Sequence, residues 1–127
     1  MSDAYERGRT IRGEVIGTER SEKALTGATD FDRPFQDLAL RYCWGDVWGR
    51  PGLDRRLRSI INLAILSAMG RSAELGVHVD GALANGVTKE EIQEIFLQVC
   101  IYAGVPAAGE AFSVAKQVFA ARREDKM

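Results

Sequence analysis

Four arginines within nine positions are the first candidates for chemistry in this sequence. They are Arg50, Arg55, Arg56 and Arg58. A guanidinium group presents a planar fork of donors that matches a carboxylate, so such a cluster can bind an anionic substrate. Arg55 and Arg58, three positions apart, fall on neighbouring parts of one helical face, while Arg56 points elsewhere. The alternative is that these arginines form surface ion pairs, which are common and contribute little.

A second group comprises Arg71, Glu74 and His78, spaced i, i+3 and i+7, which places the three side chains along one stripe of a helix. His78 is the one histidine of the chain and lies at the edge of an apolar face, where a histidine can simply be a satisfied core residue. Alternatively, Glu74 orients the ring and Arg71 contacts an anion. An imidazole with an ordinary pKa near ~6.5 can move protons at neutral pH.

The sequence lacks the residues that thiol, metal and hydrolase chemistry would need. Cys43 and Cys100 are far apart and form no CxxC motif, so we interpret them as reduced, mostly buried small side chains. One histidine excludes a metal site built on several imidazoles, and we expect no metal. Ser59, Ser67 and Ser113 have no nucleophile-elbow context, which leaves a hydrolase as a weak alternative.

Composition argues against several classes of partner. A net charge of -1 with 28% charged residues gives no reason to expect nucleic acid or an anionic membrane. The N-terminus has no apolar signal region, and no apolar run approaches the ~20 residues that span a bilayer, so we expect a cytoplasmic protein. At 127 residues, the chain has the size of one domain, which we place at residues 1–127.

The periodicity of apolar residues is helical almost throughout, which predicts an all-α bundle of about six helices. The expected helices cover residues 4–16, 21–25 (a short one), 32–43, 54–69, 72–85, 88–102 and from 106 into the charged tail. Asp54 and Ser72 are expected N-caps, and Thr88 with Glu91 forms a capping box. Gly104 should end the sixth of these segments.

Two segments do not fit a plain bundle. Residues 44–53 are rich in helix breakers yet hold both tryptophans, which indicates either a packed connector or part of a site. Residues 60–69 are apolar on nearly every side of the helix. In so small a domain this pattern predicts burial against neighbouring subunits as well as in the chain's own core.

The most specific pattern in the chain is the stretch from Trp44 to Arg56, with its WGDVW and RPGL segments. Shorter matches follow at Arg58-Ser59, Glu74-Leu75 to His78, Asn85-Gly86-Val87-Thr88 and Tyr102-Ala103-Gly104-Val105-Pro106-Ala107-Ala108. Over residues 7–119 the sequence resembles the carboxymuconolactone decarboxylase family, in the alkylhydroperoxidase-like superfamily. The resemblance implies an all-helical fold and a homo-oligomer, a trimer or hexamer.

The resemblance also implies a reaction, the loss of CO₂ from 4-carboxymuconolactone to give 3-oxoadipate enol-lactone. This step belongs to protocatechuate breakdown by the β-ketoadipate pathway. The departing carboxylate sits on a carbon joined through a C=C bond to the lactone carbonyl, so the remaining electrons delocalise onto that oxygen. Because this dicarboxylate lactone carries its own electron sink, no cofactor is expected.

The protein then has three tasks, which are to hold two carboxylates, to stabilise a developing oxyanion and to deliver one proton to carbon. The resemblance implies which residues perform them. The arginines implied in contacts to the carboxylates and the developing oxyanion are Arg50, Arg58 and Arg71. His78, aided by Glu74, would deliver the proton to carbon. Trp44 and Trp48 would wall the site and exclude water, which strengthens the charge interactions inside it.

The broader superfamily supplies a rival function, a thiol peroxidase. Its members carry a CxxC motif four residues ahead of the histidine. Aligning on His78 places Arg71 and Glu74 where the two cysteines would be. Because a thiolate is the required nucleophile, the sequence disfavours this rival.

The chain also departs from the family pattern. A second histidine, a basic residue and a second asparagine are usual at three positions, which hold Gln98, Asp80 and Ala84 here. Glutamine can hydrogen-bond but cannot donate a proton as an imidazolium does. A paralogue acting on a related carboxylated lactone is therefore one alternative, and a non-catalytic oligomeric binding protein is another.

Overall fold

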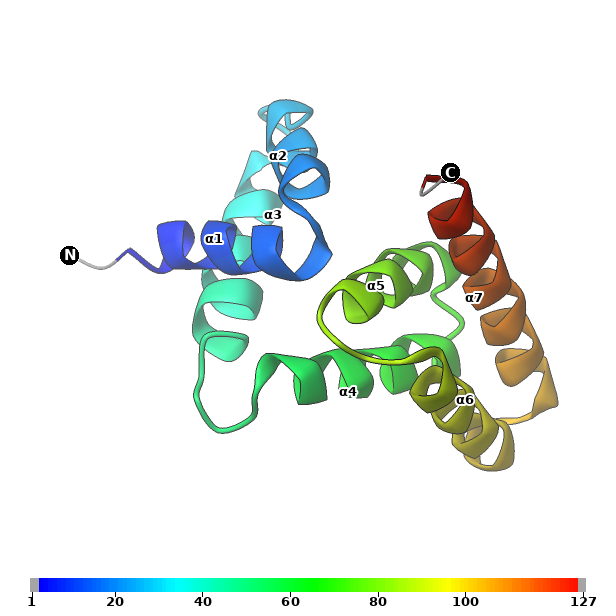
Figure 1. The fold of residues 1–127 in the computed structure, drawn as a ribbon. Helices are drawn as coiled ribbons and strands as arrows, with labels where there is room; N and C mark the ends of the chain where they lie inside the picture. The colour runs from blue at the N-terminus through cyan, green and yellow to red at the C-terminus, as the bar shows by residue number, and fades with distance from the viewer. Residues whose placement is uncertain (1–2, 126–127) are drawn as a thin grey trace. The chain divides into compact units, whose positions relative to one another are not determined.

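The computed structural model describes residues 3–125, and its regular elements in that range are all helices (Figure 1). They are α1 (Ala4–Ile16), α2 (Thr18–Thr26), α3 (Arg33–Leu38), the π-helix η1 (Ala39–Val47), α4 (Arg55–Ala68), α5 (Ser72–Ala84), α6 (Lys89–Ala103) and α7 (Val105–Asp125). The all-α prediction is confirmed. The chain divides into two compact units, up to Arg55 and from Arg56 on, and each is described by itself.

In the first unit, α1 packs against η1 backbone to backbone. A Cβ atom on Gly8 would lie 1.8 Å from the Leu40 carbonyl oxygen, and one on Gly45 would lie 2.4 Å from that of Ala4. Real Cβ atoms do not approach other atoms so closely. Glycine at these two positions is therefore what allows the two helices to touch.

The first unit has its own apolar core. It consists of Ile11, Val15, Leu40, Trp44 and Trp48. The predicted start of the connector at Trp44 is wrong, because the chain stays helical as η1 up to Val47. The Trp48 N–H donates to the carbonyl of Cys43, five residues earlier, at 3.0 Å, which is π-helical pairing. The rings of Trp44 and Trp48 stack with centroids 4.9 Å apart.

A buried arginine links the first three helices. Arg12 is 6% exposed and donates through Nε to Ser21 Oγ at 2.7 Å and through Nη2 to the Ser21 carbonyl at 3.0 Å. Its Nη1 donates to Gln36 Oε1 at 3.0 Å. Burial lowers the pKa of this guanidinium from its ordinary value. These neutral acceptors compensate part of the cost of removing the charge from water.

The second unit is formed by α4 to α7, with α7 packed against both α5 and α6. Its core residues are Leu63, Leu75, Val79, Ala82, Val87, Ile92, Phe96, Ala111 and Ala115. The capping box is confirmed, since Thr88 Oγ1 accepts from the Glu91 N–H at 3.1 Å and the Thr88 N–H donates to Glu91 Oε1 at 2.9 Å. Gly104 ends α6 as expected, with φ of 108°.

Two local predictions are wrong. Ser72 is not an N-cap, because α5 starts at Ser72 and Arg71 occupies the cap position. The Ser72 hydroxyl instead donates to Glu110 on α7. Cys43 is exposed in this chain and Cys100 is partly buried, so burial of the cysteines does not hold for Cys43.

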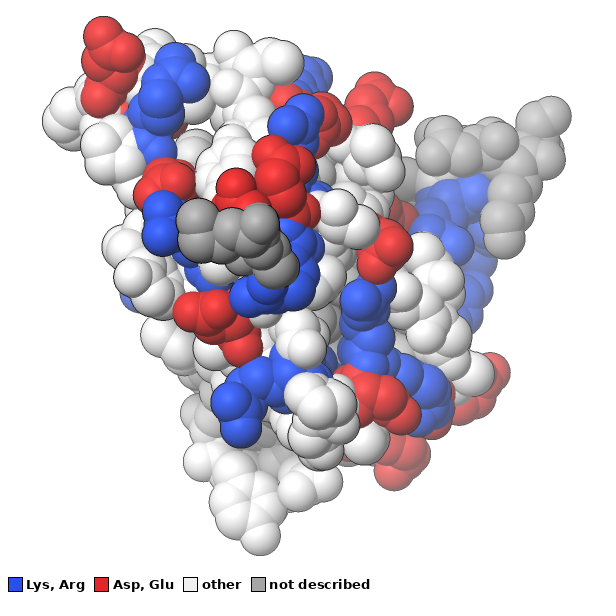
Figure 2. Space-filling model, turned by 90° about the vertical axis from the view of Figure 1, so that its left-hand side faces the viewer, with Lys and Arg blue, Asp and Glu red and all other residues white. Residues whose placement is uncertain are grey.

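The surface mixes both signs of charge. On the face drawn in Figure 2, basic and acidic side chains are interspersed. Within residues 3–125, no helix has the combination of length and apolar character that crossing a membrane requires.

Candidate active site

His78 lies on α5 in the second unit and is 6% exposed. Its neighbours on the helix, Leu75, Val79 and Ala82, belong to the core, as the sequence indicates. Across from it, the side-chain amide nitrogen of Asn62 on α4 lies 3.5 Å from the ring atom Nδ1. A single imidazole at the edge of a core, in polar contact with a neighbouring helix, can move a proton in surroundings with little water.

The face of α4 near Asn62 carries further polar groups. Arg58 precedes Asn62 by four positions and Ser59 by three, so all three lie on one side of the helix. Ser59 is 2% exposed, and its hydroxyl has no hydrogen-bond partner among the described residues. Ser67 on the same helix donates to the Leu63 carbonyl at 2.7 Å.

The sequence pattern predicts no chemistry for Asn62, and Ser59 belongs only to the weak hydrolase alternative. The available signal was a polar side chain within an otherwise apolar stretch of helix. A buried polar group needs a partner, so Asn62 should have directed attention to whatever faces it. The sequence alone does not identify that residue as His78.

Arg71 and Glu74 lie near the start of α5. Arg71 caps the helix with φ of -89° and ψ of 72°, so it stands just outside the helical stripe that the spacing predicts. Both residues are exposed, and neither side chain makes a hydrogen bond or ion pair within the part of the chain that is described. Their guanidinium and carboxylate groups are therefore accessible to a ligand.

The arginine cluster separates into two kinds. Arg55 pairs with Glu14 in the first unit, and Arg56 pairs with Glu91 in the second. For Arg55 and Arg56, which are not among the expected substrate contacts, the alternative of surface ion pairs is therefore confirmed. Arg58 is partly buried on α4, and Arg50 is exposed in the segment after η1.

The expected site residues belong to both units. Trp44, Trp48 and Arg50 lie in the first, and the others lie in the second, namely Arg58, Arg71, Glu74 and His78. Both tryptophans are 7% exposed within the core of the first unit. Their expected role as walls of the site stays a prediction, as do the roles of the other residues.

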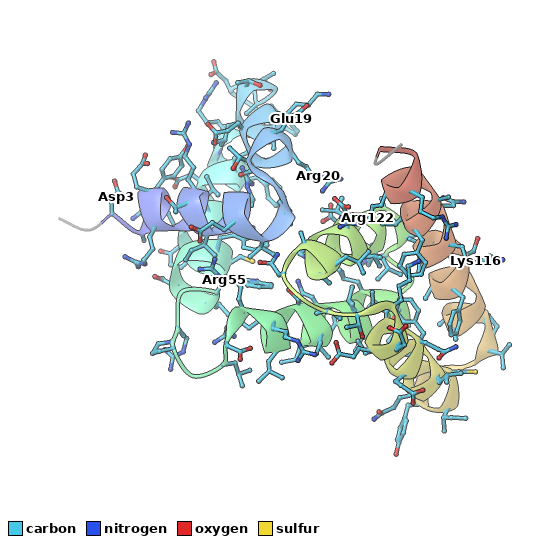
Figure 3. All side chains as sticks on the ribbon, viewed as in Figure 1. Asp3, Glu19, Arg20, Arg55, Lys116 and Arg122 are labelled. Atoms are coloured by element: carbon cyan, nitrogen blue, oxygen red, sulfur yellow. The ribbon has the colours of Figure 1, made fainter. Side chains whose placement is uncertain are left out.

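The three positions that depart from the family pattern have different surroundings in the second unit. Asp80 accepts a hydrogen bond from Arg122 Nη1 at 2.7 Å, and this ion pair ties α5 to α7. Figure 3 labels Arg122 among the side chains of the chain. Gln98 is exposed on α6 and lines an open groove of about 570 Å³ against α4. Beside Ala84, the Asn85 amide donates to the Gly81 carbonyl at 2.7 Å.

A metal site would need several ligating side chains in one place. In the described range, no cluster of three or more histidine, cysteine, aspartate or glutamate side chains could hold a metal ion. In the second unit, the partly buried Arg58 and the buried Ser59 share one side of α4 with Asn62, whose amide contacts the His78 imidazole. Such a set can bind an anion and exchange a proton with it.

This helical chain belongs to the carboxymuconolactone decarboxylase family, whose model matches residues 33–117. It is a decarboxylase of that family. The chain is 42% identical over 115 residues to a 4-carboxymuconolactone decarboxylase from Acinetobacter baylyi, covering 91% of this chain and 86% of the relative.

Two further proteins are similar to this chain. The chain is 42% identical over 113 residues to a nitrosuccinic acid decarboxylase from Metarhizium robertsii, covering 89% of this chain and 79% of the relative. It is 34% identical over 88 residues to an uncharacterised protein from Paracoccus denitrificans, covering 68% and 66%. The two relatives that are 42% identical to this chain are named for the decarboxylation of different substrates.

Proposed function

We propose that this protein removes CO₂ from 4-carboxymuconolactone without a cofactor and releases 3-oxoadipate enol-lactone, a step in protocatechuate breakdown. The observation that carries the proposal is the 42% identity over 91% of the chain to a decarboxylase of that substrate. The polar group around His78 in the second unit supplies the chemistry. Residues 1–127 then act as one catalytic domain.

The residue roles follow the chemistry of the step. As the C–C bond to the leaving carboxylate breaks, its electron pair delocalises onto the lactone carbonyl oxygen. Arginine side chains hold the second carboxylate and stabilise this oxyanion, and those we assign are Arg50, Arg58 and Arg71. His78, aided by Glu74, protonates the carbon next to the lactone carbonyl, so that the C=C bond moves to the carbon that lost CO₂ and the enol-lactone forms. Trp44 and Trp48 exclude water.

Nitrosuccinate is the second candidate substrate, because a relative named for its decarboxylation is equally identical to this chain. Both reactions need an electron-withdrawing group that accepts the electron pair of the broken C–C bond. In nitrosuccinate the nitro group on the reacting carbon is the electron sink, and the second carboxylate is again left for binding. The same arginines and the same imidazole could therefore serve either dianion.

We further propose that the protein works as a homo-oligomer, a trimer or hexamer. Support comes from the apolar groove between α4 and α6, which is lined by Ile61, Ile65 and Tyr102 among others. Tyr102 is 85% exposed and Ile101 is 80% exposed. A second copy would cover these side chains. Replacing Ile61 and Ile65 by Glu should lower the mass in sedimentation, whereas Ser113→Glu on α7 should not.

The activity is tested by generating 4-carboxymuconolactone in situ with carboxymuconate cycloisomerase and following CO₂ and enol-lactone, with chelator present. The proposal expects rapid turnover that His78→Gln reduces by roughly 10²–10⁴-fold. A folded oligomer without turnover would reject it and favour a related lactone or a non-catalytic binding protein.

A further inference from the structure

Asn62 is an unusual residue for its place on α4. It stands in the segment 60–69, where the other side chains are apolar apart from Ser67, and it is partly buried. Its amide nitrogen lies 3.5 Å from Nδ1 of His78. The contact joins the middle of α4 to the ring expected to handle the proton.

The chemistry of the two groups limits how they can pair. An amide nitrogen only donates hydrogen bonds, so with the amide oriented as it is in the structure, the Nδ1 atom that it faces accepts. A neutral imidazole with Nδ1 as acceptor carries its proton on Nε2. If the ring becomes an imidazolium, Nδ1 turns into a donor, and Asn62 can rotate its amide to present the oxygen. Asparagine is able to serve both charge states of the ring.

We infer that Asn62 is a positioning residue that engages Nδ1 of His78 and thereby makes Nε2 the nitrogen that delivers the proton to substrate. This inference rests on the proposed decarboxylation. The resting ring holds its proton on Nε2. A solvent proton then adds at Nδ1, and the Asn62 oxygen accepts a hydrogen bond from it.

The step balances. When CO₂ leaves, the electron pair of the broken C–C bond forms a new C=C bond at that carbon and the displaced pair delocalises onto the lactone carbonyl oxygen. The carbon next to this carbonyl then takes the proton from Nε2 and forms the new C–H bond of the enol-lactone. The ring is left neutral with its proton on Nδ1, and exchange with solvent restores the resting form. One solvent proton is consumed for each CO₂ released, as conversion of a carboxylate to CO₂ and a C–H bond requires.

The chain allows a direct test because His78 is its one histidine. Protein without a histidine tag, labelled with ¹⁵N-histidine, reports the two ring nitrogens of His78 alone. At a pH where the ring is neutral, wild type should show Nδ1 unprotonated and Nε2 protonated. Asn62→Asp supplies a group that only accepts, so the pattern should invert. Asn62→Leu removes the contact to Nδ1, so the fraction of rings protonated on Nε2 should fall.

Ser67→Ala is the matched control, since this hydroxyl on the same helix donates to the Leu63 carbonyl and should leave the spectrum unchanged. A wild-type ring protonated mainly on Nδ1 would overturn the inference. So would an Asn62→Asp spectrum identical to that of wild type. These signals are recorded without substrate, so the result does not depend on whether the protein turns over the lactone.

Turnover provides the functional half of the test. Asn62→Asp and Asn62→Leu should lower kcat by roughly 10–10²-fold, less than loss of the imidazole itself, while KM stays within a few fold. A tautomer inversion in Asn62→Asp with unchanged kcat would reject the positioning role. If wild type does not turn over the lactone, the proposed function fails instead.

Discussion

Gly8 on α1 lies against the Leu40 carbonyl of η1 so closely that an added Cβ would sit 1.8 Å from the oxygen. Gly8→Ala should therefore destabilise the protein by about 3 kcal/mol or more, because the two helices must separate. Gly109 on α7 is the matched control, with open space where a Cβ would stand. Gly109→Ala should stabilise by about 0.5–1 kcal/mol, since alanine favours a helix interior. Urea unfolding of both variants checks the difference in sign.

The two buried serines of α4 should respond in opposite directions to removal of their hydroxyls. The Ser59 hydroxyl is buried without a partner in the described range, so Ser59→Ala removes a desolvation cost and should stabilise by about 1 kcal/mol. Ser67→Ala loses the bond to the Leu63 carbonyl and should destabilise by about 0.5–1 kcal/mol. Equal destabilisation of both variants in thermal and urea unfolding would contradict this difference.

Glu91 makes stability depend on pH. Its pKa is lowered by the hydrogen bond from the Thr88 backbone and by Arg56. A carboxylate whose pKa is lower folded than unfolded stabilises the protein above its unfolded pKa of about 4.3, and that stability is lost as pH falls through the folded pKa.

Glu91→Gln keeps the capping geometry but removes the charge. The variant should be less stable than wild type at pH 7, and the gap should close as pH falls below about 4. Urea unfolding over this pH range measures the difference in stability between the variant and wild type, and Glu90→Gln on the same turn is the control. A gap that stays constant with pH would count against the mechanism.

Arg58 and Arg56 are two positions apart on α4 and should have separate functions. Arg56 is held by Glu91, so Arg56→Met should lower stability and leave kcat/KM nearly unchanged. Arg58→Met should lower kcat/KM by roughly 10–10²-fold, because a charged hydrogen bond to substrate is worth about 1.5–3 kcal/mol. Steady-state kinetics on folded variants distinguishes the two. Equal losses would remove Arg58 from the proposed site.

Most of the helical layout follows from local rules that the sequence displays. The helix of residues 4–16, the capping box at Thr88 and the end at Gly104 were predicted, because each depends on neighbours in the chain. The π-helical continuation to Val47 was missed. It depends on packing of the tryptophans against α1, which no local propensity encodes.

The candidate site was predictable in residue type more than in arrangement. The stripe on α5 placed His78 beside the core, and family resemblance supplied its role. The Asn62 contact was not predicted, since it joins residues 16 positions apart on different helices. The ion pair of Asp80 with Arg122 on α7 likewise needs the tertiary fold.

The most direct test of the proposed function compares kcat/KM for 4-carboxymuconolactone and nitrosuccinate in one preparation of the wild-type protein. We predict clearly higher kcat/KM for 4-carboxymuconolactone, with CO₂ and enol-lactone formed in equal amounts. A higher kcat/KM for nitrosuccinate, or no CO₂ from the lactone, would contradict the proposed function.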